Sequence, residues 1–183
     1  MMKDGTARVA VLLRGVNVGG AGTRLPMAAF RAVLEGLGCR EVRTHIQSGN
    51  AVCLSAMPPA ALAAAIGAAI TLPGGAHPAA TVLPCAALAG ALAANPFPAA
   101  EAAPATLHLF FLAPEAETGG TEAAGPAGER ALRRGDVLYL HTPAGFGTSP
   151  LARRLVRQLG RAATARNLAT VRALATLCAT PSA

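Results

Sequence analysis

The stretch VLLRGVNVGG, residues 11–20, leads directly from an aliphatic run into a polar, glycine-rich loop. The run continues upstream as RVAVLL, so we expect a strand buried on both faces over residues 6–18. Consecutive glycines can turn backbone N–H groups toward an anion, or can merely permit positive φ in a tight turn. The loop lacks Gly-Lys-Ser/Thr and the third glycine of the dinucleotide fingerprint, which favours the tight turn.

Working outward, the first half of the chain predicts a β-α-β-β-α-β order. A helix follows the loop between Pro26 and Gly38, and Ser48-Gly49-Asn50 joins two short strands as a hairpin turn. The pattern is that of the split βαβ, ferredoxin-like plait, which we expect over residues 1–85. The remaining predicted elements are strands at 41–47, 51–55 and 79–85 and a helix at 59–70.

The second half predicts a related order without sequence identity to the first. Residues 113–128 are rich in Gly, Ala and Glu and could hold a poor helix or a mobile loop. Ser149 and Pro150 begin an amphipathic helix that ends at Gly160. We therefore expect an α+β protein of two packed plaits, the second over residues 86–183 with an extra C-terminal helix. Its other expected elements are a short helix at 86–94, a strand at 106–112, a hairpin turning at 134–136 and a final helix at 167–178.

The net charge of +7 is concentrated in the last third of the chain. Residues 1–129 hold seven basic and eight acidic residues, whereas residues 130–172 hold nine Arg and a single acid, Asp136. Such a block can attract phosphates or RNA, and it can equally be a solvated helix face. Arg153 and Arg157 share one face of the predicted helix, opposite its leucines.

The cysteines and the apolar segments indicate a cytoplasmic protein. The four cysteines, Cys39, Cys53, Cys85 and Cys178, show no C-x-x-C spacing and stand in apolar surroundings, so we expect buried free thiols and no metal site. We see no signal peptide, and the longest uncharged apolar run, 60–72, is shorter than the roughly 20 residues of a spanning helix. We therefore expect no membrane partner.

Several motifs, taken in order, resemble a known bacterial family. They are LLRGVNVGG, LPM..FR..LE.LG...VRT.IQSGN, NPF, LH.FFL and TARN..TV..L, and together they extend from about Val9 to Leu177. The chain thus resembles the domain of unknown function 1697 family, whose members are expected to carry two α/β plaits. The resemblance supplies no activity and no cofactor.

By position, the resemblance implies a set of polar signature residues. His45, Cys53 and Leu168 stand where family members usually carry aromatic residues, which removes surface for base stacking. The signature residues are Arg14, Asn17, Gly19, Gly20, Gln47, Ser48, Gly49, Asn50, Asn95, Arg166, Asn167 and Thr170.

The last helix offers the best candidate for an anion site. Thr164 or Asn167 can cap that helix, whose N-terminus presents free N–H groups, and Arg166 can pair with a phosphate or carboxylate. The alternative is that the polar residue only caps the helix and that the nearby arginines form a solvated face. Arg14 and Arg24 stand on either side of the glycine loop.

Two other functions have less support in the sequence. His108 and Phe110 on one strand, with Tyr139 and His141 on another, could form a stacking platform for RNA if both pairs face outward. No standard catalytic motif is present, and a nucleophile would need an accidental pairing such as Cys53 with His45.

Three hypotheses therefore stand. The first is a binding protein for a nucleotide, phosphometabolite or RNA that uses Arg14, Gly19, Gly20, Arg166 and Asn167. The second is a small-molecule enzyme with a site between the plaits, built from Asn17, Gln47, Ser48 and Asn50. The third is a module that forms a homodimer through open sheet faces. No cofactor is expected in any of them.

Overall fold

The fold is described from a computed structural model that covers residues 5–114, 116, 120 and 122–180. Contacts divide the chain into two compact units, residues 1–89 with 173–183 and residues 90–172. The end of the chain thus groups with the first unit, whereas the sequence placed it in a second domain beginning at residue 86. The predicted domains themselves stay a prediction, because compactness alone does not show where independent folding units end.

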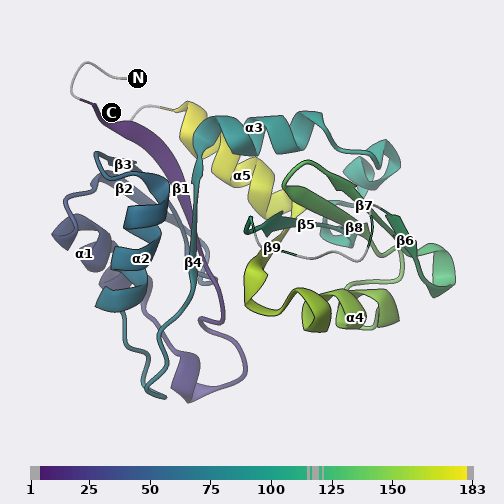
Figure 1. The fold of residues 1–183 in the computed structure, drawn as a ribbon, viewed down its shortest axis with the longest axis horizontal. Coiled ribbons are helices and arrows are strands. Elements are labelled where there is room, and N and C mark those ends of the chain that lie inside the picture. Colours follow the sequence, from purple (N-terminus) through teal and green to yellow (C-terminus); the bar gives the residue numbers. More distant parts are fainter. Residues whose placement is uncertain (1–4, 115, 117–119, 121, 181–183) are drawn as a thin grey trace. The chain divides into compact units, whose positions relative to one another are not determined.

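The first unit contains a four-stranded antiparallel sheet (Figure 1). The strand order is β2-β3-β1-β4, so the first strand in the chain is central. The predicted SGN hairpin is confirmed, since Arg43, Thr44 and His45 pair with Val52, Ala51 and Asn50. The elements are β1 (Ala7–Leu13), α1 (Met27–Gly36), β2 (Arg40–His45), β3 (Asn50–Ser55), α2 (Pro59–Ala69) and β4 (Ala80–Pro84).

Helices α1 and α2 lie on the same side of this sheet (Figure 1). Phe30 of α1 and Leu62 of α2 are fully buried against alternate residues of β1, such as Val11. The opposite face of β1 is also buried, with Ala10 and Leu12 inaccessible to solvent. The expectation of a strand buried on both faces is confirmed, although β1 ends at Leu13 and the loop begins earlier than the sequence indicated.

The second unit contains a five-stranded antiparallel sheet with the order β6-β7-β8-β5-β9. Two antiparallel sheets with flanking helices confirm the α+β class. The expectation of a poor helix or loop at 113–128 is wrong in part, because residues 122–124 form a short edge strand and residues 126–128 a 3₁₀ turn. The strands are β5 (Leu107–Leu112), β6 (Glu122–Ala124), β7 (Arg130–Arg134), β8 (Val137–His141) and β9 (Ala163–Asn167).

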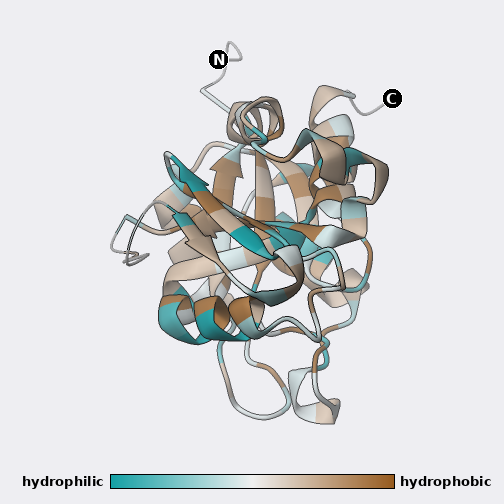
Figure 2. Cartoon of the chain, turned by 90° about the vertical axis from the view of Figure 1, so that its right-hand side faces the viewer, coloured by the Kyte–Doolittle hydropathy of each residue, from teal (hydrophilic) through white to brown (hydrophobic). Residues whose placement is uncertain are grey.

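Helix α4 (Pro150–Leu159) begins where the sequence predicted, because the Ser149 hydroxyl accepts a hydrogen bond from the Ala152 N–H at 2.9 Å. Leu151, Leu155 and Leu159 are buried on the sheet, and the arginines of the helix are exposed. Figure 2 shows this division as teal and brown faces of the helix at the lower left. The buried Glu129 carboxylate accepts a hydrogen bond from the Leu151 N–H, so the chain's own acid lies at this helix N-terminus.

The expectation that all four cysteines are free thiols is wrong for two of them. Cys85, at the start of α3 (Cys85–Ala93), and Cys178, near the end of α5 (Leu168–Ala179), form a disulfide across 93 positions of sequence. Cys39 and Cys53 are buried free thiols, as predicted. Sequence spacing could not reveal the bridge, because α3 and α5 meet only in the folded chain. The argument from free thiols to a reducing cytosol therefore loses half of its support.

The end of α5 is held a second time, by Arg43 of β2. The Arg43 guanidinium donates to the carbonyl oxygens of Leu177 and Thr180, the groups that a helix C-terminus leaves without partners. These contacts, with the disulfide, explain why residues 173–183 group with the first unit. Within the described ranges, none of these helices has both the length and the apolar character needed to cross a bilayer.

Candidate functional site

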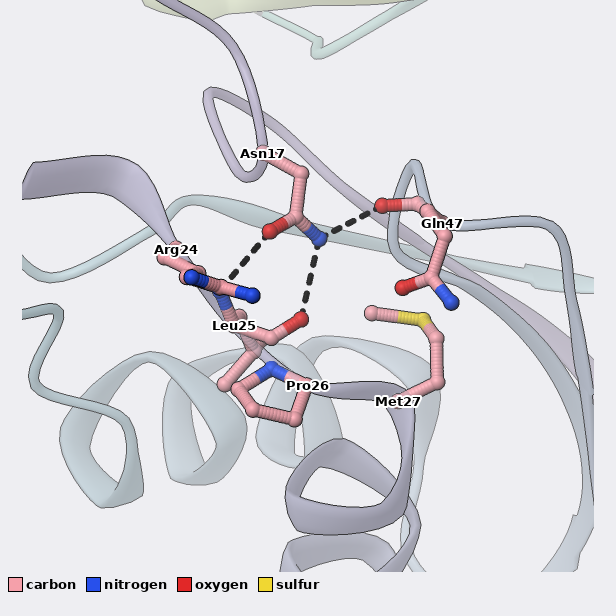
Figure 3. Close-up of a pocket in the computed structure, with 6 residues that line it drawn as sticks. All are labelled: Asn17, Arg24, Leu25, Pro26, Met27 and Gln47. Atoms are coloured by element: carbon pink, nitrogen blue, oxygen red, sulfur yellow. Dashed lines mark hydrogen bonds between the residues drawn. The ribbon is translucent and has the colours of Figure 1, made fainter. Parts of the chain in front are cut away.

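The loop after β1 is fastened by the side chain of Asn17. Its Oδ1 accepts a hydrogen bond from the Leu25 N–H at 2.9 Å, and its Nδ2 donates to the Leu25 and Gln47 carbonyl oxygens at 2.9 and 2.6 Å (Figure 3). Asn17 adopts a φ of 55°, which an Asn tolerates better than most residues. The amide thus joins the loop to the start of α1 and to the β2–β3 hairpin. Its hydrogen bonds hold these three segments together.

A hollow of about 400 Å³ opens beside this clamp. Arg24 and Gln47 bring exposed polar side chains to it, whereas Pro26 and Met27 contribute apolar surface (Figure 3). The structure gives the Arg24 side chain no ion pair within the described part of the chain. The hollow therefore offers one guanidinium and one amide above a partly apolar floor. Its lining is Asn17, Arg24, Leu25, Pro26, Met27 and Gln47.

Sequence reasoning found only part of this lining. Asn17 and Gln47 were predicted site residues, and Arg24 was noted only as flanking the loop. Pro26 was assigned to the start of a helix, and Met27, the first residue of that helix, is only partly buried. Their position directly after the loop was the available signal, since the first residues of a helix often line a site beside it.

Two further predicted residues, Ser48 and Asn50, make the hairpin turn. Asn50 is fully buried, and its Nδ2 donates to the Ser48 Oγ at 2.8 Å and to the His45 carbonyl at 3.2 Å. Between them, Gly49 has a φ of 72°, and a Cβ there would lie 2.6 Å from Val16 Cγ2. The turn thus needs these residue types to bring the hairpin against the loop.

Gly22 of the loop packs against the backbone of another segment, whereas Gly19 and Gly20 are exposed. The Gly74 N–H donates to the Gly22 carbonyl at 2.9 Å, and a Cβ on Gly74 would lie 3.0 Å from that oxygen. Gly19 and Gly20 have φ values of 71° and 127°, which glycine adopts most readily, and both are exposed. Arg14, a predicted site residue just before the loop, is positioned through its backbone, since its N–H donates to the Ala79 carbonyl at 2.8 Å.

Arg166 and Asn167 lie in the second unit, at the junction of β9 and α5. The Asn167 Oδ1 accepts from the Thr170 N–H at 2.9 Å, so Asn167 is the cap of the last helix. Arg166 lies opposite Leu109 on β5 and donates to the Ala165 carbonyl. Burial lowers the pKa of Arg166 to about 10, because it disfavours the charged form. The guanidinium still carries its charge at neutral pH. A ligand role for either residue stays a prediction.

The predicted stacking platform is wrong. Tyr139 lies opposite Leu109, one residue out of phase with His108 and Phe110, so the two pairs face opposite sides of the sheet. Phe110 and Tyr139 are also 2% and 1% exposed, which leaves no ring face for a base. The error follows from register, since alternation along each strand does not fix which residues of two strands share a face.

The accidental Cys53–His45 pairing that a nucleophile would need is not formed, and Cys53 is a buried thiol. His45 pairs with Asn50, whereas Cys53 points into the core and is hydrogen-bonded to Cys39. That contact, together with burial, raises the pKa of Cys53. The described residues also include no cluster of three or more His, Cys, Asp or Glu side chains able to hold a metal ion.

Comparisons with known proteins place the chain in a fold and a family. A solved structure, that of the conserved bacterial protein SP0830 from Streptococcus pneumoniae, is similar with a TM-score of 0.69 and 19% sequence identity. The alignment covers 96% of this chain and 99% of that one, and at such an identity it shows the fold alone. No curated protein matches. A family model described as "Protein of unknown function (DUF1697)" matches residues 6–139, from the start of β1 into β8, and the chain therefore belongs to this family.

Proposed function

We propose that this protein binds a small anion that carries a phosphate group, and that the hollow beside the glycine loop is the binding site. The observation that carries the proposal is the Arg24 guanidinium, which has no ion pair in the described chain and lines the hollow together with Gln47. A guanidinium forms paired, charge-assisted hydrogen bonds with phosphate oxygens, and an amide can donate one more.

The size of the hollow favours a small ligand. Its volume of about 400 Å³ lies within the roughly 300–1,000 Å³ of small-molecule sites. A nucleotide or a phosphorylated metabolite fits this range, and RNA would fit only through a single nucleotide. Gly19 and Gly20, which the first hypothesis also used, are exposed in the same loop and are not among the residues that line the hollow.

The uneven distribution of charge along the chain makes the proposal testable. The hollow lies in a part of the sequence where acids and bases are nearly balanced, whereas the excess of Arg lies in residues 130–172. A ligand attracted only by net charge would follow the Arg-rich segment. A ligand held in the hollow would depend on Arg24 itself.

The test is a thermal-shift screen against inorganic phosphate, sugar phosphates, nucleoside monophosphates and short RNA, at low and high salt. We expect at least one phosphate-bearing compound to raise the melting temperature, and Arg24→Gln to abolish that shift. Arg31→Gln is the matched control, because Arg31 is an exposed arginine of α1 that does not line the hollow.

Arg166→Ala tests the competing prediction that the second unit holds the anion. If Arg166→Ala removes the shift and Arg24→Gln leaves it intact, the proposed site is wrong. A flat response of the unmodified protein to the whole panel would contradict the function itself.

We also infer that the first unit is a ferredoxin-like plait and that the second unit is a variant of it. Support comes from the strand order β2-β3-β1-β4 with helices after the first and third strands, the arrangement that a split βαβ unit requires. In the second unit, β7-β8-β5-β9 repeats that order with β6 added at the edge. The described residues between β5 and β7 form β6 and a 3₁₀ turn where a plait has its first helix. For a cytoplasmic location, the two free thiols are in favour and the Cys85–Cys178 disulfide is against, because disulfides are rare in the reducing cytosol.

A further inference from the structure

The solvent side of α4 and the residues just after it carry four arginines. Arg153, Arg154 and Arg157 lie within about 100° of arc on the helix at 3.6 residues per turn. Arg161 follows two residues after the helix ends at Leu159. All four arginines are exposed, and none has an ion pair within the described part of the chain. The teal stretches of α4 in Figure 2 mark this hydrophilic side of the helix. We call these four arginines the basic face.

Folding does not account for this arrangement of charge. Arg153 and Arg157 are four residues apart and Arg154 and Arg157 are three apart, so like charges are neighbours on the helix surface. Such pairs destabilise a helix. Residues 137–183 contain no Asp or Glu that could offset the repulsion from nearby in the sequence. A local cost to stability of this kind is typical of a surface that serves a function.

The described acids of the second unit do not neutralise the basic face. Glu101 and Glu122 form ion pairs with other arginines, at 2.9 and 2.7 Å. Glu129 is buried and accepts the hydrogen bond from the Leu151 N–H. Asp136 forms no ion pair with the basic face. The positive charge is therefore directed at solvent, where it attracts a polyanion.

A second hollow, of about 210 Å³, opens beside Arg154. It is smaller than the roughly 300–1,000 Å³ of small-molecule sites, so it suits one flat ring rather than a whole nucleotide. A guanidinium stacks on such a ring, and neighbouring arginines can bind the phosphates that precede and follow it. Apart from Arg154 the lining is apolar: Ala124, Gly125, Pro126, Pro150 and Leu151.

We propose that the basic face binds single-stranded nucleic acid, with phosphates at the arginines and one unstacked base in the hollow at Arg154. A single strand presents an accessible flat ring beside every phosphate, which matches a row of guanidinium groups next to a small apolar hollow. A duplex keeps its bases stacked, and an acidic peptide need not carry a ring. The inference goes beyond the proposed function, because this surface lies in the second unit and the hollow at Arg24 lies in the first.

The experiment follows the fluorescence anisotropy of a labelled uridine dodecamer titrated with the protein, between about 50 and 200 mM salt. Each phosphate contact on a single strand adds about 0.7 to the slope of log affinity against log salt concentration, so we expect a slope of about −2 to −3. Arg157→Gln should weaken binding and make this slope shallower by about 0.7. Arg31→Gln, at an exposed arginine of α1, is the matched control and should change neither quantity.

An abasic dodecamer with the same sugar-phosphate backbone isolates the contribution of the hollow. Stacking of one base contributes about fivefold or more in affinity, so the parent protein should bind the uridine dodecamer at least about fivefold more tightly. Arg154→Gln should remove this preference. Arg157→Gln should retain it, because Arg157 does not line the hollow.

Thermal melts of both variants separate loss of binding from loss of folding. Removal of one of two neighbouring like charges should leave the melting temperature unchanged or raise it. A lower melting temperature in Arg154→Gln and Arg157→Gln would overturn the argument that the fold does not require the basic face.

The remaining outcomes decide between kinds of partner. Tighter binding to a duplex of the same length, with no preference over the abasic strand, would overturn a single-stranded partner. Binding of polyglutamate as tight as that of the uridine dodecamer would overturn nucleic acid in favour of an acidic protein. No binding of the dodecamer, or an unchanged salt slope in Arg157→Gln, would overturn the surface itself. The hollow at Arg24 is tested separately, since none of these variants alters its lining.

Discussion

At the scale of single residues, His108 makes stability depend on pH. Its ring stacks on Phe146 with centroids 4.0 Å apart, and its Nδ1 is buried without a hydrogen-bond partner in the described structure. Burial lowers the pKa of His108 from 6.5 to about 4, because the protonated ring loses its hydration. Well above pH 6.5 the ring is neutral in both states, so the full stability is present there.

As pH falls from 6.5 to 4, the unfolded chain takes up the proton before the folded chain does, and the free energy of unfolding decreases. We expect a loss of up to about 3 kcal/mol across this window. Urea denaturation at pH 7 and pH 4.5 measures it, with His108→Phe as the comparison because Phe keeps the stacking and cannot titrate. Burial also lowers the pKa of His141, so the variant should keep a smaller slope of the same sign. Equal slopes in both proteins would contradict this account.

At the scale of elements, the ends of α5 are held by side chains from other segments. Asn167 caps its start, and Arg43 accounts for carbonyl groups at its end. Replacement of Asn167 by Ala should lower the free energy of unfolding by about 1 kcal/mol, the usual loss for a helix cap. Asn167→Asp keeps the cap and should restore the stability in a urea titration.

The same pair of variants separates a structural role from a ligand role for Asn167. We expect Asn167→Ala to leave anion binding unchanged, because the proposed site at Arg24 lies in the first unit and Asn167 lies in the second, where its Oδ1 caps the last helix. A loss of binding in both variants, without loss of stability in Asn167→Asp, would restore the sequence prediction that this residue contacts the ligand.

Local signals predicted most of the elements and little of the site. The Ser149 cap, the Pro59 helix start and the SGN turn act within a few residues, and the structure has these elements where the sequence placed them. Tertiary features were missed for a physical reason: which strand faces coincide depends on register, and which cysteines pair depends on the folded path. The hollow belongs to this class, since it forms only where the loop meets Gln47.

At the scale of the whole molecule, the Cys85–Cys178 disulfide closes a covalent loop across 93 positions of the chain. Such a bridge stabilises mainly by restricting the unfolded chain, and we expect its reduction to lower the free energy of unfolding by about 2–4 kcal/mol. The double variant Cys85→Ser, Cys178→Ser should match the reduced protein in chemical denaturation.

Thiol counting under denaturing conditions checks the pairing directly. The protein as isolated should release two reactive thiols, from Cys39 and Cys53, and four after reduction. Four thiols before reduction would show that the bridge is absent and would return the cysteines to the original expectation of a reduced protein.

The central claim is that the hollow beside the glycine loop holds an anion, and amide NMR tests it most directly. Adenosine monophosphate is titrated into ¹⁵N-labelled protein, and the shifted amides are mapped on the sequence. The account predicts that the largest shifts fall at residues 17–27 and 46–48, around Arg24 and Gln47. Shifts confined to the Arg-rich residues 153–166, or no shifts at all, would contradict it.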